Sequence, residues 1–303
     1  MSVQPFDSAT IDEWTNLITS QDEALKKLQA VELGILEVID AFCKKYDIKY
    51  FIDGGTALGA MRHHGFIPWD DDIDIGMPRE DYDRFCELAS VGLPKGFSLH
   101  TARNTEGYSA LFAKVYKDGT VFENQEARES NTVMGIFVDV FPYDRLYEDS
   151  KLRSAQVNGA SVAQKRSYLY YLSTISVPHK GLLGTIEKVG CSILHHVERL
   201  RTKDPSAYQD LFDQSAPNPE TGAVSQECLT LAWPNMSPFP VDEIFPTCEA
   251  EFEGLRFPVP RETDKYLTTM YGDWRKIPAP EDRHTHLPLF IDFGNGEQWR
   301  SGR

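Results

Sequence analysis

The sequence predicts an α+β fold, a mixed β-sheet flanked by helices, with additional helical segments. Apolar residues recur at helical spacing over 20–48, which indicates a long amphipathic helix. Short apolar segments such as 72–77 and 135–144 alternate as strands do. Helices and strands do not follow the regular alternation of a parallel α/β fold, and this favours the α+β class.

The N-terminal half begins with the long helix, in which Ser20 and Glu23 fit a capping box. A glycine turn then leads into a short helix, for which Thr56 is the expected N-cap residue and Gly65 the C-terminal stop. The elements expected here are, in order, a strand at 49–53, a short helix up to 65, a strand at 72–77 and a helix at 81–89.

Hairpin signals stand out in the rest of the chain. Asp118-Gly119 predicts a hairpin between strands 110–117 and 120–124, and Glu253-Gly254 predicts one within 248–260. The other elements expected are strands at 96–102 and 135–144, helices at 150–176 and 261–274, and one more helical stretch within 177–235. We expect a single catalytic domain over 1–303, with 150–240 as a helical insertion or subdomain.

The charge balance excludes one class of partner. The chain has 31 Lys and Arg against 46 Asp and Glu, a net charge of −15. Binding to a nucleic-acid polymer depends on phosphate neutralisation by Lys and Arg, so none is expected. A general anionic-membrane surface is disfavoured too, although a local basic patch would allow peripheral contact.

The cysteines and the N-terminus indicate a reducing compartment. The five cysteines are odd in number and form no C-x-x-C pair, so neither a disulfide framework nor a zinc knuckle is indicated. The N-terminus carries acids and lacks the apolar core of a signal peptide. We therefore expect a cytoplasmic protein, and the sequence predicts no oligomeric state.

Two acids on the predicted strand 72–77 indicate a metal site. Residues two apart on a strand face the same side, so Asp72 and Asp74 would point together. Two carboxylates this close repel each other unless one is protonated or a cation lies between them. Mg²⁺ commonly combines one or two carboxylates with substrate phosphates. The pair therefore predicts Mg²⁺ or Mn²⁺ and phosphate chemistry, and a solvated acidic edge is the alternative.

A third acid, Asp139, lies on another apolar strand, on the same face as Phe137 and Phe141. A lone carboxylate among aromatic residues is unfavourable unless it is paired or ligates a metal. A salt bridge or a hydrogen bond to a loop would also explain it. With Asp72 and Asp74 available, a site of three carboxylates is the better explanation.

The glycine turn before these acids suits phosphate. Gly54, Gly55 and Thr56 stand between a strand and a helix, where backbone N–H groups point outward at the positive end of the helix. A tight bend without a ligand is the alternative. Arg62 and Lys114 are further candidates for a phosphate contact, with a solvated surface position as the alternative.

At these residues the sequence resembles the LicD family, which includes the fukutin-related proteins. The block YFIDGGTALGAMRHHGFIPWDDDIDIGMPREDYDRF looks like the signature of that family, and the similarity covers 30–145 and 245–290. The family resembles nucleotidyltransferase-fold enzymes, in which a Gly-Gly or Gly-Ser turn precedes an acid-x-acid strand and a third acid follows on a later strand. Here that pattern falls on Gly54 and Gly55, on Asp72 and Asp74, and on Asp139.

The resemblance implies a metal-dependent transferase with a nucleotidyltransferase-like sheet. Bacterial members move phosphocholine from CDP-choline to a cell-surface glycan such as teichoic acid or lipopolysaccharide, and eukaryotic relatives move phospho-ribitol from CDP-ribitol. A CDP-linked alcohol donor, a glycan or glycolipid acceptor and a position at the inner face of the membrane are thus expected. Asp72, Asp74 and Asp139 would hold the metal, or Asp139 would be the general base.

Two other functions stay open. A nucleotidyltransferase that adds NMP from an NTP to a small hydroxylated acceptor would use the same acids. A catalytically inactive scaffold or binding module is the third possibility, and the three intact acids speak against it.

Two groups of side chains are candidates for contacts with the substrate. An aromatic box would cover the quaternary ammonium of choline, and a small cationic group would contact phosphate. The candidates are Trp69, Tyr271 and Trp274 for the box, and Arg283, His284 and His286 for the cationic group. Core positions and structural roles are the alternatives, and no cysteine stands at ligand spacing for zinc.

Overall fold

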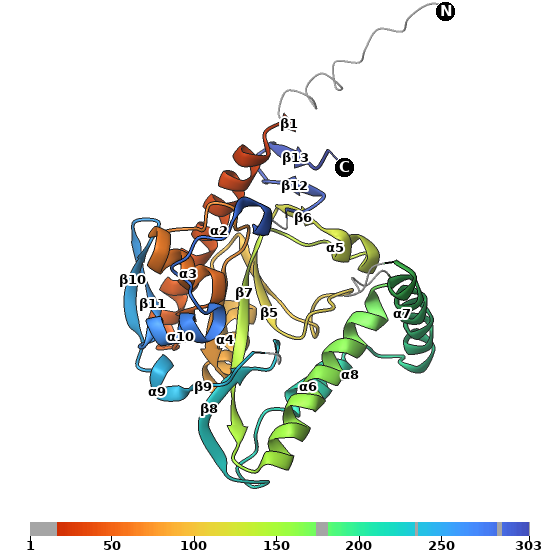
Figure 1. The fold of residues 1–303 in the computed structure, drawn as a ribbon. Helices are drawn as coiled ribbons and strands as arrows, with labels where there is room; N and C mark the ends of the chain where they lie inside the picture. Colours follow the sequence, from red (N-terminus) through yellow and green to blue (C-terminus); the bar gives the residue numbers. More distant parts are fainter. Residues whose placement is uncertain (1–16, 174–180, 234–235, 284–286, 303) are drawn as a thin grey trace, which may run out of the picture.

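A mixed seven-stranded sheet forms the centre of the fold (Figure 1). The computed structural model describes residues 17–173, 181–233, 236–283 and 287–302. The strands of the central sheet are β2 (Phe51–Ile52), β3 (Asp74–Pro78), β7 (Phe137–Tyr147), β5 (Ala113–Lys117) and β4 (Phe97–His100), with β8 (Val224–Thr230) beside β7 and β9 (Phe239–Pro240) beside β8. Only β3 and β7 pair in parallel, and the other pairs in this sheet are antiparallel. The predicted α+β class, a mixed sheet flanked by helices, is confirmed.

Two smaller sheets complete the described strands. One contains β1 (Leu17–Ile18), β13 (Gln298–Arg300), β12 (Phe290–Asp292) and β6 (Val121–Glu123), and the other is the hairpin of β10 (Cys248–Phe252) and β11 (Leu255–Val259). The hairpin at Glu253-Gly254 is confirmed, with both turn residues at positive φ. The hairpin predicted at Asp118-Gly119 is wrong. Both edges of β5 are already paired, with β4 and with β7, so β6 pairs with β12 instead.

The helices flank the central sheet. They are α2 (Gln21–Tyr46), α3 (Gly54–His63), α4 (Arg79–Gly92), α5 (Gln125–Ser130), α6 (Ser150–Tyr171), α7 (Gly181–Arg201), α8 (Ala207–Asp213), α9 (Val241–Ile244), α10 (Thr263–Tyr271) and a 3₁₀ turn, η1 (Pro280–Asp282). The N-cap residue of α2 is Ser20, whose hydroxyl accepts a hydrogen bond from the Glu23 amide at 3.4 Å. The face of α2 with Leu28, Ile35 and Ile39 is fully buried, and the helix packs against β5 and β7.

Helix α3 begins earlier than the sequence predicts. Its N-cap residue is Asp53 and not Thr56, because the Asp53 carboxylate accepts a hydrogen bond from the Gly54 amide at 2.7 Å. The Thr56 hydroxyl accepts a hydrogen bond from the Asp74 amide at 2.9 Å and so joins the helix to β3. The helix ends at His64, which takes the left-handed conformation expected of Gly65. A Cβ at Gly65 would lie 2.1 Å from the Glu253 carboxylate, so this glycine is needed for close packing.

The strand predicted over 72–77 begins at Asp74, so Asp72 lies in the loop before it. Its partner β2 has only two residues, because the chain enters α3 directly after Ile52 and Asp53. Alternation along a strand therefore cannot place Asp72 on the side of Asp74, and the geometry of that loop decides its position.

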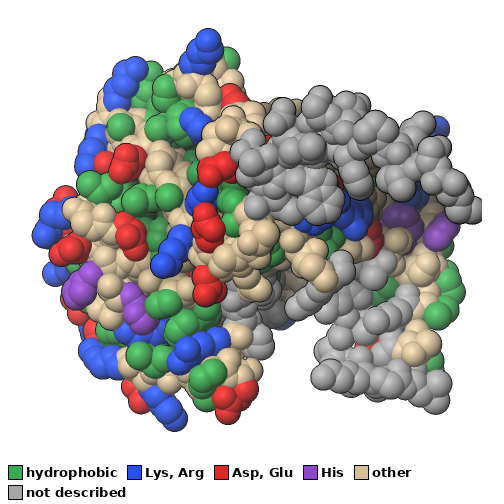
Figure 2. Space-filling view, turned by 90° about the horizontal axis from the view of Figure 1, so that it is seen from above, with side chains coloured by type: hydrophobic (Ala, Val, Ile, Leu, Met, Phe, Trp, Pro, Cys, Tyr) green, Lys and Arg blue, Asp and Glu red, His purple; other side chains and the backbone are tan. Residues whose placement is uncertain are grey.

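The three helices α6, α7 and α8 lie together on one side of the molecule (Figure 1). They account for most of the segment 150–240, but its strand β8, which the sequence did not predict, pairs with β7 in the central sheet. Within the described residues, no helix combines the length and the apolarity needed to cross a membrane. Figure 2 views the molecule from above and shows basic and acidic side chains interspersed over the part of this face that is not grey.

Candidate active site

Three charged residues stand side by side on neighbouring strands. Asp74 on β3 is directly opposite Asp139 on β7, which is directly opposite Lys114 on β5. The Lys114 ammonium donates a hydrogen bond to the Asp139 carboxylate at 2.6 Å, and both side chains are about nine-tenths buried. The same ammonium lies 3.5 Å from the centre of the Phe137 ring. Lys114 therefore does not occupy the solvated surface position that was the alternative to a phosphate contact, because this cation neutralises a buried acid.

Burial and neighbouring charge shift the pKa values of these acids. Burial raises the pKa of Asp139, Lys114 opposes that shift, Asp72 adds to it, and the result is about 6. The pKa of Asp74 is raised well above its usual value by burial and then by Asp72 and Asp139. Protonation or a cation would relieve the repulsion between these groups.

The glycine turn closes one side of this group. A Cβ at Gly54 would lie 3.5 Å from Oδ2 of Asp74 and from the Tyr271 hydroxyl. The φ angle of Gly54 is +50°, which favours glycine. Its amide donates to Oδ1 of Asp53 and lies 3.2 Å from the Tyr266 hydroxyl, so protein oxygens already use this N–H group.

Asp53 itself is buried and fully hydrogen-bonded. Its carboxylate accepts hydrogen bonds from the Gly54 amide, from the Tyr143 hydroxyl at 2.8 Å and from the Tyr266 hydroxyl. Burial raises its pKa, and these three donors oppose the shift. Asp53 thus fixes the start of α3 next to Asp74, a role that the sequence analysis missed.

The loop before β3 brings another acid to the turn. A Cβ at Gly55 would lie 2.9 Å from Oδ2 of Asp70, so a side chain at this position would displace that carboxylate. Burial raises the pKa of Asp70 to about 8, with Asp72 and Asp71 adding to the shift and Arg62 opposing it. Arg62 donates hydrogen bonds to the Trp274 carbonyl at 2.9 Å and to the His63 ring. Gly55 and Arg62 therefore both border Asp70.

A further acid, Glu32, reaches this group from α2. Its side chain is only 1% exposed, and among the described residues Oε2 has no hydrogen-bond partner. One turn earlier, the Gln29 amide donates to the Asp70 carbonyl at 2.8 Å, so this face of α2 borders the acidic loop. Burial, followed by Asp72 and other nearby acids, raises the pKa of Glu32 well above its usual value. The signal in the sequence was an acid at a core position of the predicted helix.

The predicted aromatic box is not assembled. Trp274 is 6% exposed, and its indole N–H donates to Asp264 at 3.1 Å, so it belongs to the core. Trp69 is covered by the Arg283 guanidinium, 4.4 Å from the ring centre. Tyr271 is 43% exposed as a whole, but its hydroxyl lies beside Gly54 and the acids, where burial raises its pKa. His284 and His286 lie outside the described residues.

The donor set suits a hard divalent cation, although the ligands are not gathered around one point. Among the described residues, no three His, Cys, Asp or Glu side chains are arranged to hold a single ion. The acids near Asp74 nevertheless offer carboxylate oxygens, which Mg²⁺ and Mn²⁺ prefer, and one buried oxygen of Glu32 has no partner. The chemistry of these residues therefore fits such a cation.

Comparisons with known proteins relate this chain to one family of transferases. Residues 47–179 match the family described as LicD/FKTN/FKRP, nucleotidyltransferase domain. Over 263 residues the chain is 28% identical to the lipopolysaccharide cholinephosphotransferase LicD of Haemophilus influenzae, covering 86% of this chain and 95% of that protein. A segment of 79 residues is 35% identical to the human ribitol 5-phosphate transferase FKRP, covering 24% of this chain and 14% of that protein.

Proposed function

This chain contains a LicD-family nucleotidyltransferase domain, and on that premise we propose that it moves a phospho-alcohol from a CDP-linked donor to a hydroxyl group of a cell-surface glycan. Phosphocholine is the first choice for the transferred group, because the relative that aligns over most of this chain is a lipopolysaccharide cholinephosphotransferase. Lipopolysaccharide is accordingly the first acceptor to test, and teichoic acid the second.

One observation carries the proposal: Asp74, Asp139 and Lys114 lie in register on three adjacent strands, next to the start of α3. In the reaction, the oxygen of the acceptor hydroxyl bonds to the phosphorus that bears the alcohol, and the P–O bond to CMP breaks. Asp139 takes the hydroxyl proton. Its pKa of about 6 suits a base that works near neutral pH.

Lys114 keeps Asp139 in place and in its ionised form, because the ammonium lies 2.6 Å from the carboxylate. This pairing supports the role of base over that of metal ligand for Asp139. Asp72 and Asp74 would hold Mg²⁺ or Mn²⁺, whose charge neutralises a diphosphate and the departing CMP. Gly54, Gly55, Thr56 and Arg62 are the residues that we propose to border the donor phosphates.

We further propose that the protein works in the cytoplasm, in peripheral contact with the inner face of the membrane, where a lipid-linked glycan would be accessible. The net charge of −15 speaks against a nucleic-acid polymer as partner.

A panel of donors tests the reaction type. CDP-choline, CDP-ribitol, CDP-glycerol and the four NTPs are incubated with the protein, lipopolysaccharide and Mg²⁺ or Mn²⁺, and the release of CMP and of pyrophosphate is measured. The proposal expects CMP without pyrophosphate, from CDP-choline in the first instance. Pyrophosphate from an NTP would identify a nucleotidyltransferase instead, and no turnover of any donor would favour an inactive scaffold.

A further inference from the structure

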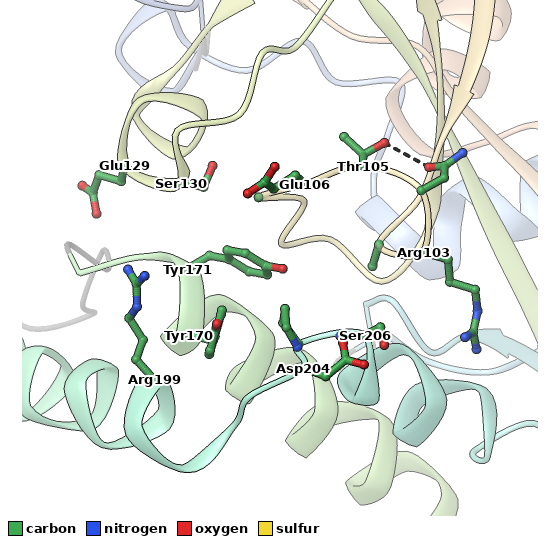
Figure 3. A pocket seen from close by; sticks show the side chains of 14 residues that line it. Arg103, Thr105, Glu106, Glu129, Ser130, Tyr170, Tyr171, Arg199, Asp204 and Ser206 are labelled. Carbon is green, nitrogen blue, oxygen red and sulfur yellow. Dashed lines mark hydrogen bonds between the residues drawn. The ribbon is translucent and has the colours of Figure 1, made fainter.

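A cavity of about 640 Å³ lies apart from the acidic residues, between the loop after β4 and the helices α6 and α7 (Figure 3). Its volume is in the range of small-molecule sites, which are commonly found between structural units. Its walls come from the loop 102–107, the end of α5, the C-terminal turn of α6, α7 and the turn before α8. None of its lining residues has a role in the chemistry proposed above.

The tyrosine ring of Tyr171 projects into the cavity, between Glu106 on one wall and Asp204 on the other (Figure 3). Tyr170 packs against Tyr171 edge to face at 4.9 Å and so fixes the orientation of the ring. Tyr171 therefore offers a half-buried aromatic face in a polar surrounding.

Two planar charged groups in the walls are free to bind a ligand. Within the part of the chain that the structure describes, neither the Glu106 carboxylate nor the Arg199 guanidinium has an ion pair or a hydrogen-bond partner; Arg199 only lies 5.7 Å from the ring centre of Tyr170. Both are water-exposed groups that can exchange water for ligand hydroxyls. Carboxylate and guanidinium groups each present two adjacent bonding atoms, which match two neighbouring hydroxyls of a sugar ring.

The charge of the cavity does not suit the nucleotide donor. Its acids Glu106, Glu129 and Asp204 outnumber its cations Arg103 and Arg199. Arg103 is already paired with Asp210 and Asp213, at 2.8 Å each. A diphosphate would meet net negative charge here, whereas an uncharged polyhydroxyl ligand would not.

Neither Lys114 nor Asp139 lines this cavity. A void of only about 10 Å³ has Gly107 and Ser130 in common with the cavity and has Lys114 in its wall. A Cβ at Gly107 would lie 2.0 Å from the Thr132 hydroxyl and 2.7 Å from the Ser130 carbonyl, and its φ is +75°, so this position in the shared wall requires glycine.

We propose that this cavity binds a pyranose unit of the acceptor glycan, with its ring stacked on Tyr171 and its hydroxyls bonded to Glu106 and Arg199. Only the identification of this sugar as part of the acceptor rests on the proposed function, because the sugar can bind whether or not transfer takes place. In this arrangement the acceptor sugar binds beside α6 and α7, whereas the nucleotide donor binds at the acids near α3. The helices α6 and α7 then select the glycan.

Binding of simple sugars tests the site directly. Saturation-transfer NMR is recorded with the methyl pyranosides of glucose, galactose, N-acetylglucosamine and N-acetylgalactosamine, on the wild-type protein and on Tyr171→Ala, Tyr171→Phe and Glu106→Gln. We expect at least one pyranoside to bind, a tenfold or greater loss of affinity in Tyr171→Ala, and a loss below threefold in Tyr171→Phe, which keeps the ring. Unfolding midpoints verify that each variant is folded.

Two results would overturn the inference: no pyranoside binds the wild-type protein, or Tyr171→Ala binds as tightly as wild type. The outcome is separable from that of the proposed function. If no CDP-alcohol is consumed and Tyr171-dependent sugar binding persists, the function fails and the sugar site stands. If choline transfer proceeds with the same acceptor KM in Tyr171→Ala and wild type, the function stands and the site fails.

Discussion

At the scale of single residues, the proposed chemistry depends on the pair of Asp139 and Lys114. An isolated buried carboxylate would stay protonated at neutral pH, and a strongly solvated one would be too weak a base. The ammonium at 2.6 Å lowers the pKa of Asp139 while burial and Asp72 raise it, and these effects leave it at about 6. The carboxylate is therefore ionised at neutral pH and still basic enough to take a proton.

This balance predicts the pH dependence of the reaction. A base must be deprotonated, so kcat/KM should fall as the pH drops below about 6. Lys114→Met removes the group that lowers the pKa of Asp139, so this acid limb should move to higher pH. Lys117→Met on the same strand is the control and should leave the limb in place. An unmoved limb in Lys114→Met would exclude Asp139 as the base.

Glu32 predicts a pH-dependent stability. Its pKa is raised in the folded protein, so the unfolded chain loses this proton at lower pH than the folded one, and stability falls as the pH rises above about 4.5. Glu32→Gln has no proton to lose at this position. Its free energy of unfolding relative to that of wild type should therefore increase from pH 4 to pH 8, by at least about 1 kcal/mol. Urea unfolding at several pH values measures this. Glu37→Gln, at an exposed position of the same helix, is the control. If the stability difference between Glu32→Gln and wild type does not vary with pH, the pKa of Glu32 is not raised in the folded protein.

At the scale of elements, the site is assembled where α3, β3 and β7 begin. Asp53 starts α3, the Asp53 amide bonds the Asp74 carbonyl at 2.9 Å, and the Asp139 amide bonds the Ile73 carbonyl at 3.0 Å. These backbone bonds set the spacing between the turn and the two acids. A shift of any one of these elements would therefore separate Asp74 from Asp139.

The start of α3 predicts a difference between two helical glycines. A Cβ at Gly34 in α2 would meet nothing within 4 Å, so Gly34→Ala should stabilise the protein by roughly 0.5–1 kcal/mol. A Cβ at Gly55 meets Asp70 at 2.9 Å, so Gly55→Ala should lack that gain and, by moving Asp70, weaken the binding of CDP. Thermal unfolding and calorimetry with CDP in the presence of Mg²⁺ compare the two. Equal CDP affinity in Gly55→Ala and Gly34→Ala would show that the turn does not border the donor.

The contact between α4 and β7 predicts a large structural effect. Arg79 donates two hydrogen bonds of 2.7 Å to Asp144, which is fully buried. Asp144→Ala removes the buried carboxylate that makes both short hydrogen bonds to this guanidinium, and should cost about 3–5 kcal/mol. Asp83→Ala removes a more exposed acid 3.5 Å from the same guanidinium and should cost less than about 1 kcal/mol. Chemical denaturation distinguishes the two, and similar losses would contradict this account of the pair.

At the scale of the whole molecule, local patterns in the sequence predicted the elements and the family, and long-range pairing was harder to predict. Helix α2 and the hairpin β10–β11 depend on spacing and turn residues within one segment, and the structure has both. The resemblance to the LicD family is confirmed. The partner of β6, which is β12, and the central-sheet partner of β8, which is β7, lie far away in the sequence, and no local signal specifies them.

The acids of the candidate site could be predicted from the sequence, but their surroundings could not. Asp74 and Asp139 were identified because an acid on an apolar strand violates the local pattern. Three further features depend on tertiary packing. These are the direct register of the two acids, the position of the Lys114 ammonium over the Phe137 ring, and the approach of Glu32. The aromatic box failed for the same reason, since a tryptophan near a motif in sequence can be buried in the core, as Trp274 is.

The central claim is that the acids at the start of β3 and β7 carry phospho-alcohol transfer, and one measurement tests it most directly. CMP release from CDP-choline is followed in the presence of lipopolysaccharide and Mg²⁺, with wild type, Asp74→Asn, Asp139→Asn and the exposed Asp22→Asn as control. The account predicts CMP release by wild type and Asp22→Asn, and losses of at least about 100-fold in the other two. The unfolding midpoint of Asp74→Asn should be no lower than that of wild type, because the change removes like-charge repulsion. Asp139→Asn also leaves the Lys114 ammonium without its ion pair, so its midpoint should be lower, and activity is compared at a temperature at which it is folded. Near wild-type CMP release by a folded Asp74→Asn or Asp139→Asn protein would contradict it.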